Sequence, residues 1–235
     1  MATVKVDYFR AIDTQIKAYL LGYLMADGCL YDKTGTPLLR VSMVEKDRAI
    51  MDLLVSEIES TYAVSIRKRE KEQWQDQVQT MICNSEFNSH LMRWGITPGK
   101  TFDGMVPDEI IHSDMFSHYM RGYFDGDGTI VRSHSYYTYP FVSLCVNDPM
   151  TEQLMDPITE ALGKSPYIYR KQSINKMNFQ KRQAMTFLHW IYQDSEFHLN
   201  RKYDRYQFFV KHYENGGSPK IARPLRTAEW NRLFA

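Results

Sequence analysis

Two aspartates stand in the same short pattern at two places in the chain, and this repeated acid is the feature best suited to chemistry. The first copy, residues 20–28, reads LLGYLMADG, and the second copy, residues 120–128, reads MRGYFDGDG. Asp27 and Asp127 therefore occupy matching positions, each directly before a glycine. One isolated Asp-Gly is an ordinary turn signal. Two copies in matching contexts indicate a shared role.

Small residues recur at a helical spacing within each copy. Gly22 and Ala26 are four residues apart, as are Gly122 and Gly126, so each pair lies on one face of a helix. Such faces allow two helices to approach backbone to backbone. These four residues are therefore predicted to form a helix interface.

The two glycines that follow the aspartates, Gly28 and Gly128, are expected to end their helices in the left-handed conformation. Asp27 and Asp127 would then lie together at two helix C-termini, where they repel one another and face negative dipole ends. A divalent cation removes this conflict, because hard cations bind carboxylate, carbonyl and water oxygens. In phosphodiester hydrolysis such ions act on the attacking and leaving oxygens.

With these motifs the chain resembles the LAGLIDADG homing endonucleases, specifically the single-chain kind with two motifs, over roughly residues 14–213. The resemblance implies that Asp27 and Asp127 bind two or three Mg²⁺ ions with help from the backbone carbonyls of Ala26 and Gly126. Each ion would activate a water against one strand, giving cuts across the minor groove with short 3′ overhangs. The sixth motif position is Met25 in one copy and Asp125 in the other, a departure that concerns the helix interface.

Basic loops follow the last predicted helix of each half, at residues 97–101 and 199–203. In the resembling family a lysine of this loop approaches the scissile phosphate. The resemblance thus assigns catalytic roles to Lys100 and Lys202, whose charge would stabilise the charge that develops on the phosphate.

Composition is that of a globular protein of 235 residues with 43% hydrophobic content, enough for one large core or two linked half-cores. No apolar run is long enough to span a bilayer, and the N-terminus lacks a signal-peptide pattern. Cys29, Cys83 and Cys145 are scattered, which predicts reduced thiols and an intracellular, cytoplasmic or organellar, location. No terminal protein-splicing residues are recognised, which favours a free-standing or intron-encoded protein.

Charge is distributed unevenly although the net charge is only +1. Residues 164–182 hold six basic side chains and no acidic one, and residues 200–235 hold eight basic and three acidic ones. Local basic stretches are typical of nucleic-acid binding, while a solvated surface remains the ordinary alternative.

The pattern of helices and strands repeats and predicts an α+β fold of two pseudo-symmetric αββαββα halves. In the first half, helices are expected over residues 14–26, 46–60 and 85–94, and strands over 29–32, 38–44, 62–69 and 77–82. In the second half, helices are expected over 116–125, 151–162 and 182–193, and strands over 129–134, 141–146, 167–171 and 177–181. The predicted domains are residues 1–100, a linker over 101–115, residues 116–213, and a basic tail over 214–235.

Helices are expected to cover one face of each antiparallel sheet, leaving two open faces that form a saddle for the major groove, which admits β-ribbons. Alternation along the strands predicts which polar side chains point from the open faces. In the first half these DNA-binding candidates are Arg40, Ser42, Ser65, Arg67, Arg69, Gln77 and Gln79. In the second half they are Arg132, His134, Tyr167, Tyr169, Lys171, Lys176, Asn178 and Gln180.

The sequence thus predicts a monomeric, sequence-specific endonuclease that binds double-stranded DNA, has no membrane partner, and makes a Mg²⁺-dependent double-strand break in a long asymmetric target. A non-cutting DNA-binding regulator of the same fold is the first alternative, although a regulator has no need of paired metal-binding acids. An RNA maturase that assists intron splicing is the second alternative, because the same surface can hold RNA.

Overall fold

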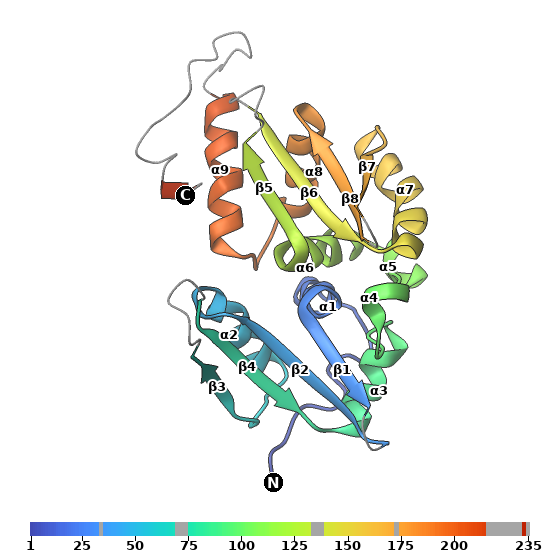
Figure 1. Cartoon of the computed structure of the whole chain (residues 1–235), viewed down its shortest axis with the longest axis vertical. Coiled ribbons are helices and arrows are strands. Elements are labelled where there is room, and N and C mark those ends of the chain that lie inside the picture. The colour runs from blue at the N-terminus through green and yellow to red at the C-terminus, as the bar shows by residue number, and fades with distance from the viewer. Residues whose placement is uncertain (33–34, 69–74, 133–138, 172–173, 215–231, 234–235) are drawn as a thin grey trace. The chain divides into compact units, whose positions relative to one another are not determined.

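The computed structural model describes residues 1–32, 35–68, 75–132, 139–171, 174–214 and 232–233, and it divides into two compact units, Met1–Gly126 and Asp127–Ala235. Each unit contains one four-stranded antiparallel sheet with helices packed against it (Figure 1). The predicted α+β class with two antiparallel sheets is therefore confirmed.

The first unit has the strand order β1-β2-β4-β3. Its strands are β1 (Gly28–Asp32), β2 (Pro37–Val44), β3 (Val64–Arg67) and β4 (Gln77–Ile82). Its longer helices are α1 (Gln15–Asp27), α2 (Arg48–Glu57), α3 (Ser85–Arg93) and α6 (Phe116–Asp127), and its short turns are η1 (Glu45–Asp47), α4 (Lys100–Asp103) and α5 (Asp108–Ile111). The last residue of α6, Asp127, is the first residue of the second unit.

The second unit repeats this topology with the strand order β5-β6-β8-β7. Its strands are β5 (Gly128–Arg132), β6 (Pro140–Val146), β7 (Tyr167–Lys171) and β8 (Ile174–Gln180). Its helices are α7 (Asp148–Leu162), α8 (Arg182–Tyr192) and α9 (Asn200–Glu214). Figure 1 shows α8 behind β6 and β8, the strands against which it packs.

Alternation along the central strands separates a buried face from an open one. In β2 the side chains of Leu39, Val41 and Met43 are buried against α1, α2 and α3, while the intervening residues are partly exposed. In β6, Val142 and Leu144 are fully buried in the same way. This alternation leaves the other face of each sheet free of the covering helices.

Polar side chains begin the helices where the sequence has cap residues. Thr14 accepts a hydrogen bond from the Lys17 backbone N–H at the start of α1, and Asn84 and Asn147 do the same for α3 and α7. Thr14 thus begins α1 as predicted. Within the described part of the chain, no helix combines the length and the apolar character needed to cross a membrane.

Helices α1 and α6 approach each other through their backbones at Gly22 and Gly122. A Cβ atom built on Gly22 would lie 2.0 Å from the Tyr119 carbonyl oxygen, and one built on Gly122 would lie 1.9 Å from the Tyr19 carbonyl oxygen. Real Cβ atoms do not approach carbonyl oxygens this closely. Each motif glycine is therefore required by the backbone of the opposite helix.

Gly28 corrects the expected role of the glycine after each aspartate. It has φ −70° and ψ 142°, an extended conformation, and it begins β1 at once instead of ending α1 in the left-handed region. Gly128 likewise begins β5 and is not among the described glycines with positive φ. Space is the physical reason for Gly28, because a Cβ there would lie 2.5 Å from the Leu24 carbonyl oxygen.

Adding one methyl group at the α1–α6 contact is expected to destabilise the protein. For Gly122→Ala we expect a loss of about 1–3 kcal/mol or more in the free energy of unfolding, because the new Cβ meets rigid backbone and not a movable side chain. Urea denaturation measures the free energy of unfolding of the variant and of the wild-type protein. Ser117→Ala, on the same helix, is the matched control. Equal unfolding midpoints for the two variants would show that α1 and α6 do not pack through this glycine.

Candidate metal centre and nucleic-acid interface

The C-terminal end of α1 gathers a carboxylate, backbone carbonyls and a buried amine. Asp27 is the last residue of α1 and is partly exposed. The Nζ of Lys100 donates to the Ala26 carbonyl oxygen at 3.3 Å and also to the Met25 carbonyl oxygen. Lys100 is only 8% exposed, so its charge is held at this helix end and not in solvent. Carboxylate and carbonyl oxygens of this kind are the donors that hard divalent cations bind.

Lys100 reaches this position because the chain turns sharply just before it. Gly99 has φ 87°, in the left-handed region, and α4 begins at the next residue. The lysine is therefore the first residue of a short helix and not part of an open loop. Its cation also compensates the negative end of the α1 dipole, where the backbone carbonyls have no intrahelical partners.

The end of α6 lies against the end of α1 at a second small-residue contact. A Cβ built on Gly126 would lie 2.3 Å from the Ala26 Cβ and 3.5 Å from Asp27 Oδ2. The predicted interface residues Gly22, Ala26, Gly122 and Gly126 thus all lie where α1 meets α6. A larger residue at position 126 would displace the metal-binding candidate Asp27 from its present place.

Tyr23 lies one helical turn before Asp27 and is kept protonated. Burial raises the pKa of the Tyr23 hydroxyl, and the Asp27 carboxylate raises it further through its charge and a hydrogen bond. Asp47 and Asp125 act in the same direction. The tyrosine therefore remains a neutral hydrogen-bond donor near Asp27 at physiological pH.

A buried polar cluster joins α1 to α6 in the turns that precede Asp27 and Gly126. The Tyr19 hydroxyl donates to Asp125 Oδ2 at 2.9 Å, and the Arg121 guanidinium lies 5.5 Å from the centre of the Tyr19 ring. Arg121 also lies 2.7 Å from His118 Nδ1 through its Nη1. Arg121 and Asp125 are 0% and 1% exposed. The departure at the sixth motif position is therefore structural, because Asp125 has a partner on α1.

In the second unit, Asp127, Lys202 and Cys145 act on one another electrostatically. Burial raises the pKa of the Cys145 thiol, the Asp127 carboxylate raises it further, and Lys176 and Lys202 oppose this effect. Lys202 is only 3% exposed, as expected of a positioned cation. Like Lys100, it lies within the first turn of a helix, here α9, and not in the predicted loop.

Helix α9 is held beside the strand that follows Asp127. The Nη1 of Arg205, one turn after Lys202, donates to the Ile130 carbonyl oxygen of β5 at 3.1 Å. Phe208 and Phe209 are buried farther along the helix. Residues 199–203 are predicted as a basic loop and residues 204–213 as part of the second half without an element, so this helix is an addition from the structure.

The open face of the first sheet carries the predicted polar residues in direct cross-strand pairs. Ser42 and Ser65 flank Gln79 on neighbouring strands, and Arg67 lies opposite Gln77. The Ser42 hydroxyl lies 3.3 Å from Gln77 Oε1 and donates to it.

Two further side chains of this sheet qualify the prediction. The Arg40 guanidinium stacks over the Tyr31 ring at 4.9 Å, so β1 also contributes to the open face. Ile66, expected to point inward, lies opposite the buried Val78 but is 46% exposed. The reason is that β3 is the edge strand of the sheet.

The open face of the second sheet is more aromatic. Tyr169 lies opposite Lys176 and Tyr167 lies opposite Asn178, with 49% and 61% of the two tyrosines exposed. Gln180, at the end of β8, is also exposed. Asn178 differs from the expectation, because it is only 6% exposed between its neighbours Tyr167 and Ser143.

Four candidates cannot be placed on either face. Arg69 and His134 lie outside the described residues, and the side chains of Arg132 and Lys171 are likewise not described. Strict alternation could have found several open-face residues that were not predicted. These are Cys29, Tyr31, Phe141, Ser143 and Cys145.

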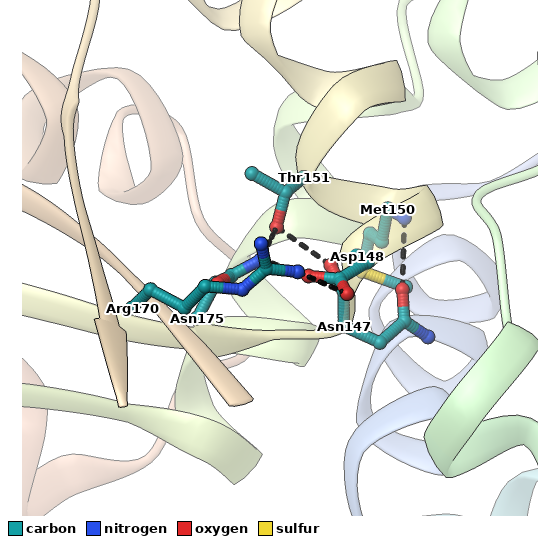
Figure 2. Close-up of polar contacts among 6 residues, drawn as sticks. All are labelled: Asn147, Asp148, Met150, Thr151, Arg170 and Asn175. Atoms are coloured by element: carbon teal, nitrogen blue, oxygen red, sulfur yellow. Dashed lines mark hydrogen bonds and ion pairs between the residues drawn. The ribbon is translucent and has the colours of Figure 1, made fainter. Parts of the chain in front are cut away.

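A polar network holds the β7–β8 hairpin against the start of α7 (Figure 2). The buried Asn175 donates through Nδ2 to Asp148 Oδ1 at 2.7 Å and to Thr151 Oγ1 at 2.9 Å. Arg170 of β7 forms an ion pair with the other carboxylate oxygen of Asp148. The Thr151 hydroxyl donates in turn to the Asn147 carbonyl oxygen at 2.6 Å. This network fixes the hairpin that carries Tyr167, Tyr169 and Lys176.

Another group of possible metal ligands lies on the surface of the first unit. One ligand atom each from Asp7, Glu86 and His90 lie within 4.8 Å of one another. Asp7 Oδ1 lies 3.7 Å from His90 Nε2, and this contact links the N-terminal segment to α3. Exposed acids of this kind commonly occur without a metal, so the contact is sufficiently explained as a surface ion pair.

The chain has the fold of the LAGLIDADG meganucleases. The crystal structure of meganuclease I-SmaMI bound to uncleavable DNA matches with a TM-score of 0.61 and 12% sequence identity, over 93% of this chain and 99% of that chain. LAGLIDADG meganuclease I-AabMI bound to uncleaved DNA matches with a TM-score of 0.60 and 14% identity, over 92% of this chain and 96% of that chain. LAGLIDADG meganuclease I-CpaMI bound to uncleaved DNA matches with a TM-score of 0.54 and 11% identity, over 86% of this chain and 93% of that chain. No protein-family model and no curated protein sequence matches the chain.

Removing the central amide of the hairpin network is expected to loosen the second sheet. For Asn175→Ala we expect a loss of about 1–3 kcal/mol in the free energy of unfolding, because the buried Thr151 hydroxyl and the more exposed Asp148 carboxylate lose their shared donor. Thermal unfolding measures the change, and Lys176→Ala, the exposed neighbour on the same strand, is the control. If both variants unfold at the wild-type temperature, the network does not hold the hairpin.

Proposed function

We propose that the protein is a sequence-specific, metal-dependent DNA endonuclease that makes a double-strand break in a long asymmetric target. One observation carries the proposal: at the end of α1 the partly exposed Asp27 carboxylate adjoins the Ala26 carbonyl, on which the buried amine of Lys100 is held. Oxygen donors of this kind hold a hard cation. A fixed positive charge beside them stabilises the negative charge that develops on a reacting phosphate. The fold shared with DNA-bound meganucleases supports the same conclusion.

The donor set fits a divalent ion such as Mg²⁺. Asp27 and Asp127, each the last residue of its helix, would supply carboxylates, and Ala26 and Gly126 would supply carbonyl oxygens. Such an ion, when bound, lowers the pKa of a coordinated water and neutralises charge on the phosphate. The Asp7, Glu86 and His90 group is not needed for this role.

Lys100 and Lys202 would act as fixed cations toward the scissile phosphates. Both are nearly fully buried, 8% and 3% exposed, so their charges do not need to be drawn from solvent during the reaction. A preorganised positive charge stabilises negative charge that develops in the transition state. Tyr23, whose pKa is raised by burial and by the Asp27 carboxylate, would stay neutral beside these donors.

The two open sheet faces would read the target. Arginine and glutamine side chains such as Arg67 and Gln77 have the donors and acceptors that recognise base edges in the major groove. The second face carries tyrosines and Lys176 in their place. Because the two faces differ in chemistry, the two half-sites of the target should differ in sequence, and one chain would suffice as a monomer.

The acid at the end of each motif helix should be needed for cutting and not for binding. We expect Asp27→Asn and Asp127→Asn each to abolish double-strand cleavage while specific affinity stays within a few-fold of wild type, because each loses a metal ligand but no base contact. The substrate is a duplex selected from a randomised library by wild-type protein, assayed with Mg²⁺ and with EDTA. Asp156→Asn, an exposed acid on α7, is the control.

Three outcomes separate the candidate functions. Loss of affinity parallel to loss of cutting would contradict the assignment of these acids as metal ligands. Specific binding without cutting by wild-type protein in any divalent ion would favour the regulator. Selection of a structured RNA in preference to every duplex would favour the maturase.

Exposed residues on the two sheet faces should divide into base readers and phosphate contacts. For Arg67→Ala we expect relaxed preference at base pairs of one half-site only, at about 1–3 kcal/mol per bidentate contact. For Lys176→Ala on the second face we expect affinity to fall about equally for all sequences, with a salt slope smaller by about one contact. Cleavage profiling over targets randomised in each half measures the first effect, and binding titrations at several salt concentrations measure the second. Altered preference in both halves of the target after Arg67→Ala would refute this division.

A further inference from the structure

The second unit contains a pocket at the end of its sheet that the proposed cutting reaction does not use. It has a volume of about 780 Å³ and lies where β7 begins, β8 ends and α8 begins. Its lining includes Tyr139, Lys164, Tyr167, Asn178, Lys181 and Arg182. Tyr167 and Asn178 belong to the open face of the sheet, so the pocket adjoins the proposed DNA-binding surface.

The charge of the pocket is suited to an anion. Lys164, Lys181 and Arg182 are three cations, and none of the described residues that line the pocket is acidic. The sequence from Lys164 to Arg182 also contains no acid. Helix α8 starts at Arg182 without a side-chain cap, so its positive dipole end adds to the same field. Phosphate oxygens are the ligands that such a set of donors binds.

Beside these cations the pocket has an aromatic platform and a buried amide. Tyr167 is 61% exposed and lies directly opposite Asn178 across the β7–β8 pair. Asn178 is only 6% exposed, and its Oδ1 has no hydrogen-bond partner among the described residues. Rotation about χ2, which is soft in asparagine, turns this amide toward the pocket. An amide edge next to a tyrosine ring recognises a nucleobase.

Size decides between a phosphate alone and a whole nucleotide. A pocket of about 780 Å³ is in the range of small-molecule sites and far exceeds one phosphate group. We propose that this pocket receives one nucleotide, with its phosphate on Lys164, Lys181 and Arg182, its base on Tyr167, and the base edge on Asn178. The proposal rests on the proposed function where the nucleotide belongs to the DNA target, because such a base must leave the duplex stack.

The first unit lacks the polar member of this site. Matching the registers Gly28–Val41 and Gly128–Leu144 places Met81 at the position of Asn178, and Met81 is 45% exposed. A thioether cannot pair with a base edge as an amide does. The inferred nucleotide site is therefore particular to the second unit, and it would act on one half of the target only.

Free nucleotides test the pocket without any knowledge of the target. We expect dCMP and dAMP, whose bases carry an amino group, to bind wild-type protein saturably by calorimetry, and inorganic phosphate to bind at least tenfold more weakly. Tyr167→Ala should weaken dCMP binding at least tenfold. Tyr169→Ala is the matched control, because it removes an exposed tyrosine of the same strand and face that does not line the pocket. Equal dCMP affinity in the two variants would overturn the proposal.

A second arm asks whether the nucleotide comes from DNA. The fluorescent base 2-aminopurine is placed in turn at each position of the selected duplex, and its emission rises when it leaves the stack. A rise at one position on binding, lost in Tyr167→Ala and kept in Asp156→Asn, supports a nucleotide of the target. Saturable dCMP binding with no such rise supports a free nucleotide as the occupant.

The site is overturned if the protein shows no Tyr167-dependent rise in emission and no saturable nucleotide binding. If the protein is not a DNA endonuclease, the results differ from those above. No duplex is selected or cut, while dCMP still binds and its binding still depends on Tyr167.

Discussion

At Gly22 and Gly122 the backbones of α1 and α6 pass so close that neither position has room for a Cβ atom. This contact fixes the two helices along their length and therefore fixes where they end. Four residues later the same face brings Gly126 against Ala26, beside the Asp27 carboxylate. The geometry of the candidate metal centre in the first unit thus follows from the absence of side chains one turn earlier. Lys100 then adds a buried cation at the carbonyls that end α1.

Polar groups buried between α1 and α6 also fix how the two helices align along their length. Tyr19 and Asp125 pair across α1 and α6, and the fully buried Arg121 lies over the Tyr19 ring. Removing one partner from such a cluster leaves a buried polar group without compensation, which disfavours other alignments of the helices. Sliding α6 by one turn would separate Asp125 from Tyr19 and place larger residues at the glycine contact. Small residues and the polar cluster therefore specify the same alignment.

Much of the fold could be predicted because its signals are local. The repeated Asp-Gly motif, the N-cap Thr14 and period-two alternation along β2 each depend on neighbouring residues only. What escaped prediction depends on distant contacts. The extended backbone at Gly28 is set by its pairing with Val41 of β2, and the burial of Asn178 is set by its cross-strand neighbours. Helix α9 was not predicted, although Tyr206 and Phe209 recur at helical spacing and are buried, and it packs against α8 and β5, for example through Arg205.

We propose that the ends of α1 and α6 form the chemical centre, where Asp27 and Asp127 hold divalent ions on DNA, and that the sheet faces read the target. Anomalous scattering from crystals of the protein with a selected duplex and Mn²⁺ tests the metal-binding role of the two aspartates directly. We expect peaks about 2.1 Å from the carboxylate oxygens of Asp27 and Asp127. Peaks held only by Asp7, Glu86 and His90, or no peak at either aspartate in a complex with ordered DNA, would contradict it.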